Sequence, residues 1–395
     1  MRLLFSPCGI GFGHIGRLIP LAHRLKIKGA DVLFSTYGEA LKYARKEGFP
    51  AIQVPEIEFK VKEDGSVDLK RSLTDPGPFL IHYILLKQIC AELRVIKRYK
   101  PDVVVSDTRA SPIIASRLLD VPVITILNQF NIIIPRKKRF LRLSRWADHG
   151  SIAVLSKIWA SSDKVLIPDF PEPYTLSEGN LNIPERYRRK VEFIGPILPS
   201  YPDQLPSKEE LREKLNVEEG KKLIFAPISG PSKEKYPFIK ILREAFKGFP
   251  EEYKIVMSIG EPEKPFLLWN DEKMKVYGWV ENRFEYLKAC DLIVSRAGHE
   301  TLMHSICYGK PIILVPTPSH TEQLINAKKA FDLGFALVLE QAKISRETLL
   351  KSVEKIINSS FRDKVREINR MAKRFNGMEA ALREILAHVE YRAYC

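Results

Sequence analysis

Short apolar runs alternate along the chain with longer segments in which hydrophobic residues recur every three or four positions. In the first half the apolar runs lie near Leu3, Val32, Ile52, Val103 and Ile124, and segments with helical spacing follow several of them. Strands that alternate with helices in this way predict a parallel sheet covered by helices on both faces. The first half is therefore expected to form a doubly wound, Rossmann-like α/β domain.

A proline-rich stretch at 194–206 interrupts this alternation and is typical of a linker between domains. The pattern then restarts with a strand at 223–226 and a helix at 238–249, and further strands are expected near Ile255, Val276, Ile293, Ile312 and Ala336. We therefore predict an N-terminal Rossmann-like domain, a linker, a second and smaller Rossmann-like domain, and C-terminal helices. These parts are expected at residues 1–195, 196–207, 208–365 and 366–395.

Length and composition agree with this organisation. The 395 residues exceed what one hydrophobic core usually supports, and 45% hydrophobic with 28% charged residues is ordinary for a soluble globular protein. No apolar run reaches the roughly 18 residues of a membrane span, and the start of the chain has no signal-peptide pattern, so we expect a cytoplasmic protein. The five cysteines have no paired or metal-like spacing, so neither disulfides nor structural zinc is expected.

The formal net charge of +15 indicates an anionic partner. A phosphorylated metabolite, a nucleic acid or an anionic membrane surface would each meet this condition. The abundance of Lys, Glu, Arg and Ile beside few glutamines also resembles the composition of proteins from heat-adapted organisms.

A glycine-rich turn at 8–14, CGIGFGH, follows the first strand and opens a helix. Glycines at this spacing serve dinucleotide binding, phosphate binding and ordinary tight turns alike. A dinucleotide site also needs an acidic residue about 20 positions further on, at the end of a second strand. The strand at 31–34 ends in Ser35-Thr36-Tyr37, without an acid, which argues against a dinucleotide.

A second strand-to-helix turn lies at 295–301, SRAGHET, between an apolar strand at 291–294 and a segment of helical spacing at 302–308. Unpaired N–H groups and the positive end of the helix dipole would meet at this turn. Gly298 would let a phosphate approach the backbone closely. The turn therefore predicts an anion site.

Four motifs in order along the chain match one family. They are Gly13-His14 before a helix, the strand at 101–107, Gly278-Trp279-Val280, and the segment 295–326. Together they resemble the inverting glycosyltransferases of the GT-B fold, which include MurG-like N-acetylglucosaminyltransferases and small-molecule UDP-glycosyltransferases. The resemblance covers nearly the whole chain. It implies two Rossmann-like domains with a cleft between them, C-terminal helices that cross back to the first domain, and transfer of a sugar from a nucleotide to a hydroxyl group.

The resemblance also assigns catalytic residues. Sugar transfer needs a base to deprotonate the acceptor hydroxyl, and His14 takes this role. Asp107, at the end of its strand, is expected to orient His14 and to stabilise its protonated form, as in catalytic triads. The alternatives are that His14 is a loop or capping residue and that Asp107 caps a helix starting at 108–111.

The resemblance places the donor nucleotide sugar in the second domain. Arg296 and Thr301 are expected beside the diphosphate, since a guanidinium matches two phosphate oxygens. Trp279 is expected to stack on the base while the backbone of Val280 reads its edge; the alternative for Trp279 is a core aromatic. The predicted donor-binding residues are Gly11, Gly13, Ser229, Gly230, Trp279, Val280, Arg296, Ala297, Gly298, His299, Glu300, Thr301, His304, His320, Glu322 and Gln323.

Two positions depart from the family pattern. The usual ribose-binding glutamate falls on His304, and a neutral imidazole offers one good acceptor where a carboxylate offers two oxygens to a vicinal diol. We hypothesise that Glu300, one turn earlier, substitutes for it. Arg17 stands where many small-molecule transferases have proline, so the chain is not a close member of that branch.

An apolar and basic segment at 130–146 has the composition that an anionic membrane surface attracts. In MurG-like enzymes a comparable patch docks at the membrane to reach a lipid-linked acceptor; a solvated basic helix is the alternative. The predicted patch comprises Ile133, Ile134, Arg136, Lys137, Lys138, Arg139, Phe140, Arg142 and Trp146. We therefore expect a lipid, lipid-linked or small-molecule acceptor and peripheral binding to the inner face of the membrane.

We expect a UDP-sugar as co-substrate, no tightly bound cofactor and no metal ion, because no Asp-x-Asp motif follows a strand. Two rival functions remain. A UDP-sugar 2-epimerase of the same fold would turn over its nucleotide sugar without an acceptor. A nucleic-acid-binding protein would use the clustered basic residues alone, but it would leave the turn at 295–301 unexplained, so no nucleic-acid partner is expected. The oligomeric state is left open.

Overall fold

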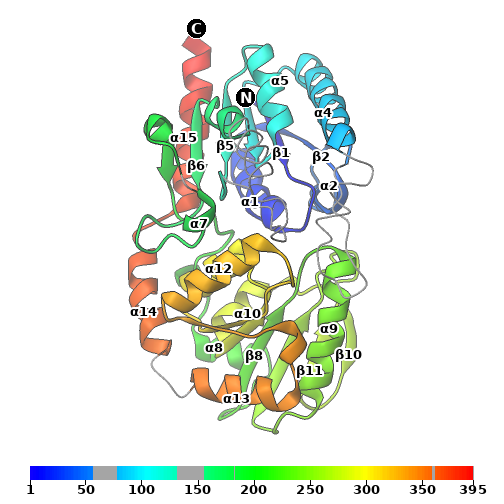
Figure 1. Ribbon diagram of the computed structural model, residues 1–395, viewed down its shortest axis with the longest axis vertical. Coiled ribbons are helices and arrows are strands. Elements are labelled where there is room, and N and C mark those ends of the chain that lie inside the picture. Colours follow the sequence, from blue (N-terminus) through cyan, green and yellow to red (C-terminus); the bar gives the residue numbers. More distant parts are fainter. Residues whose placement is uncertain (57–77, 131–154, 182, 358–360, 395) are drawn as a thin grey trace, which may run out of the picture. The chain divides into compact units, whose positions relative to one another are not determined.

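The computed structural model describes residues 1–56, 78–130, 155–181, 183–357 and 361–394. These residues form two compact units (Figure 1). The N-terminal unit holds the described residues up to 199 together with 375–394, and the C-terminal unit holds those from 200 to 374. Of the expected linker, 196–199 thus lie in the first unit and 200–207 in the second.

The N-terminal unit is built on a sheet of seven strands in the order β3-β2-β1-β4-β5-β6-β7. All neighbouring strands are parallel. Every residue of the central strand β4 is buried, as expected for a parallel strand covered on both faces. The strands are β1 (Arg2–Pro7), β2 (Asp31–Thr36), β3 (Ala51–Gln53), β4 (Val103–Asp107), β5 (Val123–Ile126), β6 (Lys164–Ile167) and β7 (Val191–Phe193).

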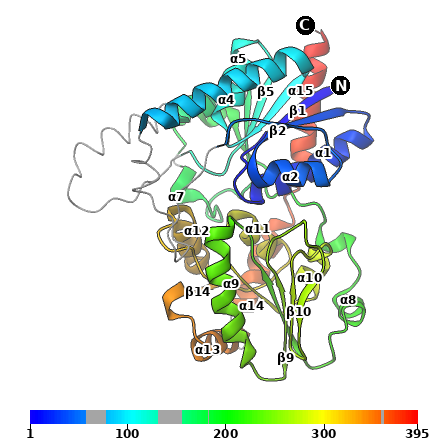
Figure 2. The same ribbon diagram turned by 90° about the vertical axis from the view of Figure 1, so that its right-hand side faces the viewer.

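Helices cover both faces of this sheet (Figure 2). On one face α4 and α5 pack together, and Ile96 and Ile113 join one hydrophobic cluster with Leu4 and Val104 of the strands. Alternate strand residues such as Leu3 point to the other face, where α1 and α15 contact each other. The helices are α1 (Gly13–Ile27), α2 (Gly38–Lys46), α4 (Pro78–Tyr99), α5 (Ala110–Leu118), α7 (Glu178–Leu181) and α15 (Gly377–Tyr394).

The C-terminal segment rejoins the N-terminal unit through a close backbone approach. A Cβ atom at Gly377 would lie 2.3 Å from the carbonyl oxygen of Gly195, so only glycine fits there. The ring of Phe375 packs edge-on against Phe170, with centroids 5.7 Å apart. Beyond this point α15 contacts α1 and β4 of the same unit.

The C-terminal unit has a second sheet of seven strands, in the order β10-β11-β9-β8-β12-β13-β14. Its pairs are parallel except that the edge strand β10 runs antiparallel to β11. The sequence pattern did not predict β10, a short apolar run directly after Pro265. The strands are β8 (Lys222–Pro227), β9 (Tyr253–Ser258), β10 (Leu267–Asn270), β11 (Met274–Tyr277), β12 (Leu292–Ser295), β13 (Ile312–Leu314) and β14 (Ala336–Val338).

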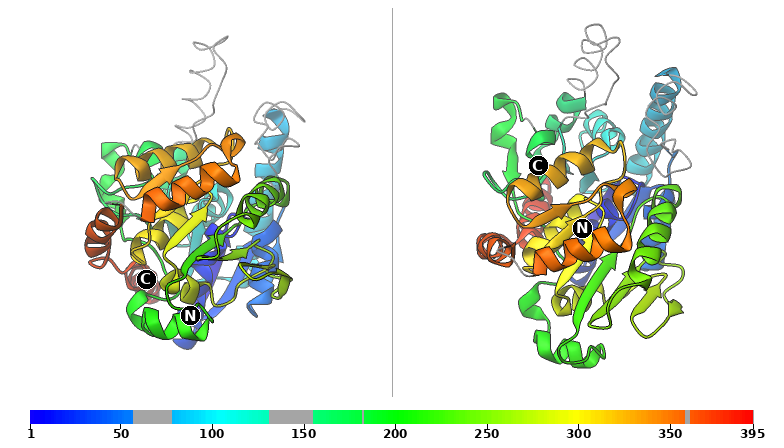
Figure 3. Two further views of the ribbon diagram at one scale, coloured as in Figure 1. Left: turned by 90° about the horizontal axis from the view of Figure 1, so that it is seen from below. Right: turned by 60° about the horizontal axis from the view of Figure 1, so that its bottom comes forward.

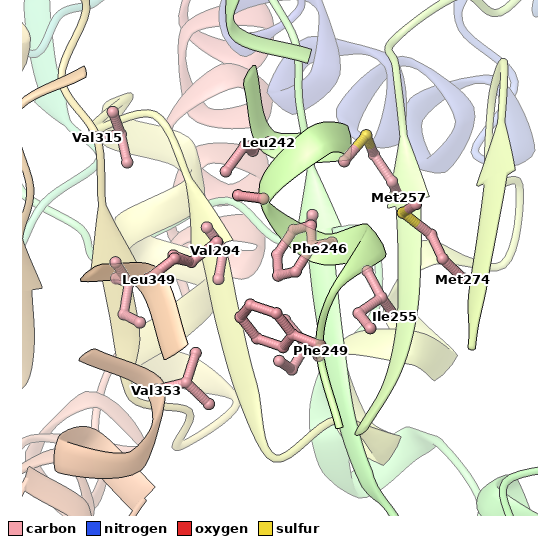
Figure 4. Packing of buried hydrophobic residues seen from close by; sticks show 14 of the residues in the cluster. Leu242, Phe246, Phe249, Ile255, Met257, Met274, Val294, Val315, Leu349 and Val353 are labelled. Carbon is pink, nitrogen blue, oxygen red and sulfur yellow. The ribbon is translucent and has the colours of Figure 1, made fainter. Parts of the chain in front are cut away.

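A hydrophobic core joins this sheet to α9 and α13. Phe246 and Phe249 lie among side chains from the strands and from α13, including Val294, Leu349 and Val353 (Figure 4). Helix α13 contacts α9, β13 and β14 (Figure 3). The helices of the unit are α8 (Lys208–Lys214), α9 (Ser232–Lys247), α10 (Arg283–Ala289), α11 (His299–Cys307), α12 (Thr321–Asp332), α13 (Arg346–Ile357) and α14 (Phe361–Ala372).

The predicted fold class is confirmed: each unit is an α/β arrangement around a largely parallel sheet. In both units the central strands end at turns that lead into helices, and parallel strands bring those turns to one edge of the sheet. The candidate site residues lie at these two edges. None of the helices in the described parts of the chain is long and apolar enough to cross a membrane.

Candidate active site

His14 lies at the second position of α1, directly after the glycine-rich turn that follows β1. The turn is tied to β4, because the N–H of Cys8 donates to the carbonyl of Asp107 at 3.1 Å. Gly11, with a φ of +68°, lies in the turn, and Gly13 is the first residue of α1. The side chain of His14 is 21% exposed, so water or a substrate can reach it.

The structure brings together His14, Arg17 and Asp107. Nδ1 of His14 is 2.7 Å from Oδ1 of Asp107. Arg17, three residues after His14 on α1, donates from Nε to Oδ2 and from Nη2 to Oδ1 of Asp107, both at 2.6 Å. Because an ionised carboxylate only accepts hydrogen bonds, His14 carries its hydrogen on Nδ1, and Nε2 holds the lone pair.

Arg17 also fixes the charge of Asp107. Burial alone would raise the pKa of this carboxyl, but the charge of Arg17 and the hydrogen bonds from Arg17 and His14 outweigh burial and lower the pKa to about 2. Asp107 is completely buried, so its oxygens are shielded from solvent. The carboxylate is therefore ionised at any working pH.

Asp107 does not cap the helix that follows it. Helix α5 begins at Ala110 with Arg109 at the N-cap position, and no side chain caps it. Besides Arg17 and His14, Asp107 accepts a bond from the hydroxyl of Thr108 at 3.1 Å. The carboxylate thus faces α1 and its own turn.

A second buried ion pair supports this edge of the sheet. Arg109 lies 2.7 Å from Glu92 of α4, and its Nη1 donates to the carbonyl of Ser35 at 2.8 Å. Burial raises the pKa of Glu92, although Arg109 and Ser35 act in the opposite direction. Neither Glu92 nor Arg109 was among the predicted site residues, because the pair joins residues far apart in the sequence.

The turn between β12 and α11 is open at Gly298. An added Cβ at this residue would meet no atom within 4 Å, and its φ of −69° is accessible to any residue. Asn326 of α12 donates to the carbonyl of Ala297 at 3.3 Å and holds the turn. His299, Glu300 and Thr301 form the first turn of α11. The N–H groups at the start of α11 therefore border free space at Gly298.

Arg296 is directed away from this free space. Its guanidinium donates to the carbonyls of Val315, Pro316 and Glu234 and, at 2.7 Å, to Oε1 of Gln341. It also lies 3.8 Å from the ring centroid of Phe238. Burial lowers the pKa of Arg296 to about 9. Through these contacts Arg296 links segments inside the unit, and we do not assign it to the diphosphate.

Trp279 and Val280 follow β11. Trp279 is 9% exposed, and the guanidinium of Arg283 lies 5.5 Å from its ring centroid. The N–H of Val280 already donates to the hydroxyl of Ser258 at 3.3 Å. That N–H is therefore already used inside the unit and is not available to read the edge of the base. Trp279 stays the candidate for stacking on the base.

His304 has a different environment from a ribose-binding carboxylate. Burial, together with the charges of Arg283 and His299, lowers the pKa of His304 to about 3, so the imidazole is neutral. Its Nε2 is 3.9 Å from Oε2 of Glu300, beyond hydrogen-bond range. The hypothesised substitute Glu300 thus lies beside His304 on the same face of α11.

The remaining predicted donor residues lie at the start of α12 and after β8. His320 caps α12, with Nδ1 accepting from the N–H of Gln323 at 3.5 Å, and Oε1 of Gln323 accepts from the N–H of Thr317 at 2.8 Å. Glu322 lies in the first turn of α12. Ser229 and Gly230 form the turn after β8, where Gly230 has a φ of +115°.

The predicted basic and apolar patch from Ile133 to Trp146 lies outside the described residues.

Comparisons with known proteins bear on the family and the fold of the chain. Residues 228–382 match the glycosyltransferase family 28 C-terminal domain. The chain is 27% identical over 392 residues to an uncharacterized glycosyltransferase of Methanosarcina acetivorans, covering 95% of this chain and 96% of that protein. It is 25% identical over 370 residues, 90% of each chain, to UDP-N-acetylglucosamine–N-acetylmuramyl-(pentapeptide) pyrophosphoryl-undecaprenol N-acetylglucosamine transferase 1 of Bacillus cereus.

Among solved structures, the spinosyn rhamnosyltransferase SpnG complexed with thymidine diphosphate superposes with a TM-score of 0.65 at 15% identity. The match covers 98% of this chain and 100% of the SpnG chain. This likeness concerns the fold.

Proposed function

The chain is a glycosyltransferase of the GT-B fold, and we propose that it transfers a hexose or N-acetylhexosamine from a UDP-sugar, with inversion and without a metal ion, to a hydroxyl group of its acceptor. The observation that carries the proposal is the arrangement of His14, Asp107 and Arg17 beside the glycine-rich turn. It supplies one oriented base and one fixed counter-charge.

His14 acts as the general base through Nε2. Asp107 holds the Nδ1 hydrogen at 2.7 Å and thereby fixes both the tautomer and the orientation of the ring. When Nε2 takes the proton of the acceptor hydroxyl, the imidazolium forms next to an ionised carboxylate, which stabilises it. A base placed in this way contributes about 10²- to 10⁴-fold to the rate.

The state of Asp107 supports the proposed inversion. A retaining enzyme that forms a covalent intermediate needs a carboxylate that can reach the anomeric carbon. Asp107 is completely buried, and both of its oxygens are held by Arg17. Asp107 is therefore not available as such a nucleophile, which supports a single direct displacement, assisted by the base, that inverts the anomeric centre.

The diphosphate leaving group is held at the start of α11. The N–H groups of the first turn and the positive end of the helix dipole favour an anion there, and Gly298 leaves space for a phosphate. These groups supply the stabilisation that a divalent cation supplies in other transferases.

The acceptor is a lipid-linked or small-molecule hydroxyl compound. Two observations support a lipid-linked one: the name of the Bacillus cereus relative, which specifies a pyrophosphoryl-undecaprenol acceptor, and the apolar and basic sequence at 130–146. A protein of net charge +15 with such a segment binds peripherally to the anionic inner face of a membrane.

A His14→Ala variant tests the proposal. The wild-type donor is first identified by thermal shift with UDP, GDP, dTDP, ADP and their sugars, and with single-stranded RNA as a comparison. We expect the variant to bind the same nucleotide as the wild type but to lose turnover by about 10²-fold or more, because only the proton transfer is removed.

His23→Ala is the matched control, since His23 is an exposed histidine on the same helix whose Nε2 lies 3.5 Å from Oε2 of Glu47 and whose ring packs against Phe49. Activity of His14→Ala within about tenfold of the wild type would contradict the assignment of the base. Consumption of the nucleotide sugar without an acceptor would favour an epimerase. Stabilisation by RNA alone would favour a nucleic-acid-binding protein.

A further inference from the structure

Thr108 has a backbone conformation that its side chain disfavours. Its φ is +68°, in the left-handed region, where the two heavy atoms on the Cβ of a β-branched residue are crowded. Among the residues that the structure describes, the other non-glycine residues with positive φ are Lys100, Asp120, Asn216 and Ser319, and none of these is β-branched. Strain of this kind clusters at functional sites and persists only where the surrounding structure imposes it.

The surrounding structure holds the backbone of Thr108 on both sides. Its N–H donates to the carbonyl of Ile126 at 3.1 Å, and its carbonyl accepts from Nε1 of Trp159 at 3.0 Å. Trp159 lies in a short helix at 155–160, is 2% exposed and meets Phe130 edge-on, with ring centroids 6.3 Å apart. The conformation of Thr108 is therefore fixed by the hydrophobic core of the N-terminal unit.

In this conformation the hydroxyl of Thr108 lies against the two candidate catalytic residues. Its Oγ1 donates to Oδ1 of Asp107 at 3.1 Å and lies 3.4 Å from Nδ1 of His14. Oδ1 of Asp107 also accepts from Nδ1 of His14 and from Nη2 of Arg17, at 2.7 and 2.6 Å. His14 and Arg17 belong to α1, whereas Thr108 belongs to the turn after β4, so the carboxylate is held from two elements.

A glycine at position 108 would adopt this φ without strain. The threonine therefore costs conformational free energy that a glycine would avoid. What the threonine adds is a side chain whose hydroxyl contacts the two residues to which we assign the proton transfer. The strain and the contacts together indicate a function for the hydroxyl.

We propose that Thr108 is a positioning residue for the proton transfer, because its hydroxyl fixes Oδ1 of Asp107 and, through that oxygen, the imidazole of His14. This inference rests on the proposed function, since it takes His14 to be the base. The proton of the acceptor hydroxyl passes to Nε2 of His14, while Nδ1 keeps its hydrogen and donates it to Oδ1. No proton passes to Asp107 or Thr108.

Two substitutions of Thr108 separate its hydroxyl from its shape. Thr108→Val removes the hydroxyl and keeps the β-branch, whereas Thr108→Ser keeps the hydroxyl and removes the branch. We expect kcat to fall by about tenfold or more in Thr108→Val, because a hydrogen bond to a charged group is lost. Thr108→Ser should stay within about threefold of the wild type. The KM for the donor should be unchanged in both variants, since we assign the donor to the other unit.

The measurement is the initial rate of UDP release by the full-length protein. UDP-N-acetylglucosamine and UDP-glucose are the donors, and a sugar linked to polyprenyl pyrophosphate in detergent micelles and a small alcohol are the acceptor probes. Thr108→Gly is measured as well. It removes the hydroxyl but relieves the strain, so its kcat should fall as in Thr108→Val while its melting temperature stays within about 3 °C of the wild type.

Thr125→Val is the matched control, and melting temperatures of all variants check that they fold. Thr125 lies in β5 of the same sheet, and its buried hydroxyl is 2.6 Å from that of Ser162. Its loss removes a buried hydrogen bond that does not involve His14 or Asp107. Turnover of Thr125→Val should therefore stay within about twofold of the wild type, whatever its melting temperature.

A double variant tests whether the hydroxyl acts through His14. In the His14→Ala background, Thr108→Val should lower the residual rate by no more than about twofold, because the group that it positions is already absent. A full tenfold loss in that background would overturn the inference by giving the hydroxyl an effect independent of His14.

The other outcomes separate this inference from the proposed function. Wild-type turnover in Thr108→Val, beside loss of turnover in His14→Ala, would overturn the inference and leave the base in place. Equal losses in Thr108→Ser and Thr108→Val would overturn it too, because the shape of the side chain and not its hydroxyl would then matter. If His14→Ala stays within about tenfold of the wild type, or if the wild type releases no UDP with either donor, the inference falls with the proposed function.

Discussion

Both oxygens of Asp107 are held by Arg17, which distinguishes this site from a simple histidine–carboxylate pair. A lone buried carboxylate would face a large desolvation cost, and its pKa would rise. The guanidinium removes that cost and holds Oδ1 where Nδ1 of His14 meets it at 2.7 Å. Arg17 is therefore a positioning residue that acts on His14 through Asp107.

Replacing Arg17 by methionine should be costly for stability and activity. Removing one partner of a buried pair leaves an uncompensated charge, so we expect the free energy of unfolding to fall by about 3–5 kcal/mol in urea titrations. Turnover should fall by more than about tenfold, because His14 loses its fixed partner.

The double variant Arg17→Met with Asp107→Asn separates these two effects. It should regain much of the stability, since no buried charge remains, but not the turnover. Arg117→Met is the control: Arg117 pairs with Asp163 at 2.6 Å on the surface, and such pairs contribute at most about 1 kcal/mol. Wild-type stability and turnover in Arg17→Met would refute the positioning role.

At the scale of elements, the functional turns all follow strands. Helix α1 follows β1, and α11 follows β12, so the N-terminal turn of each helix lies at the edge of its sheet where the strands end. The register between strands β1 and β4 brings the two candidate catalytic residues together. Pro7 of β1 pairs with Asp107 of β4, which places the carboxylate next to the turn that carries His14.

The turn before α11 allows a test that separates ligand binding from folding. Gly298→Ala adds a methyl group to open space at an unstrained φ of −69°, so the free energy of unfolding should change by less than about 1 kcal/mol. The same methyl group would occupy the space that we assign to a phosphate. Binding of the nucleoside diphosphate should therefore weaken by about tenfold or more in calorimetric titrations.

Gly16→Ala serves as the comparison, because a Cβ there also meets no atom within 4 Å and the residue lies inside a helix, but outside the C-terminal unit. It should leave nucleotide affinity unchanged. If Gly298→Ala binds the nucleotide as tightly as the wild type, the phosphate does not lie against this turn.

At the scale of the whole molecule, the chain is basic, with a net charge of +15, and the donor that we propose for it is anionic. The proposed catalysis uses helix N–H groups, a helix dipole and a histidine base, all of which belong to the chain itself. We therefore expect turnover to be the same, within about twofold, in excess EDTA and in millimolar Mg²⁺.

The measurement is the initial rate of nucleoside diphosphate release after the protein has been dialysed against EDTA. His14→Ala in the same buffers gives the background. A loss of more than about tenfold in EDTA that Mg²⁺ restores would contradict metal-independent transfer.

Hydrophobic periodicity and a few motifs were sufficient for the class of fold and for the general activity. Alternating strands and helices are local patterns, and the turns at 8–14 and 295–301 are continuous in sequence, so both can be recognised without coordinates. His14 and Asp107 were chosen from such motifs, and the structure then placed them 2.7 Å apart. Their catalytic roles stay predictions.

Tertiary structure decided the partners of the charged side chains. Arg296 lies in the predicted motif, yet packing turns its guanidinium toward carbonyls and Gln341, 45 residues away. Arg17 looked like a mere departure from the family pattern until the fold brought it to Asp107, 90 residues away. A sequence pattern specifies which residues are buried and which elements form, whereas the direction of a long charged side chain depends on acceptors that only the folded chain assembles.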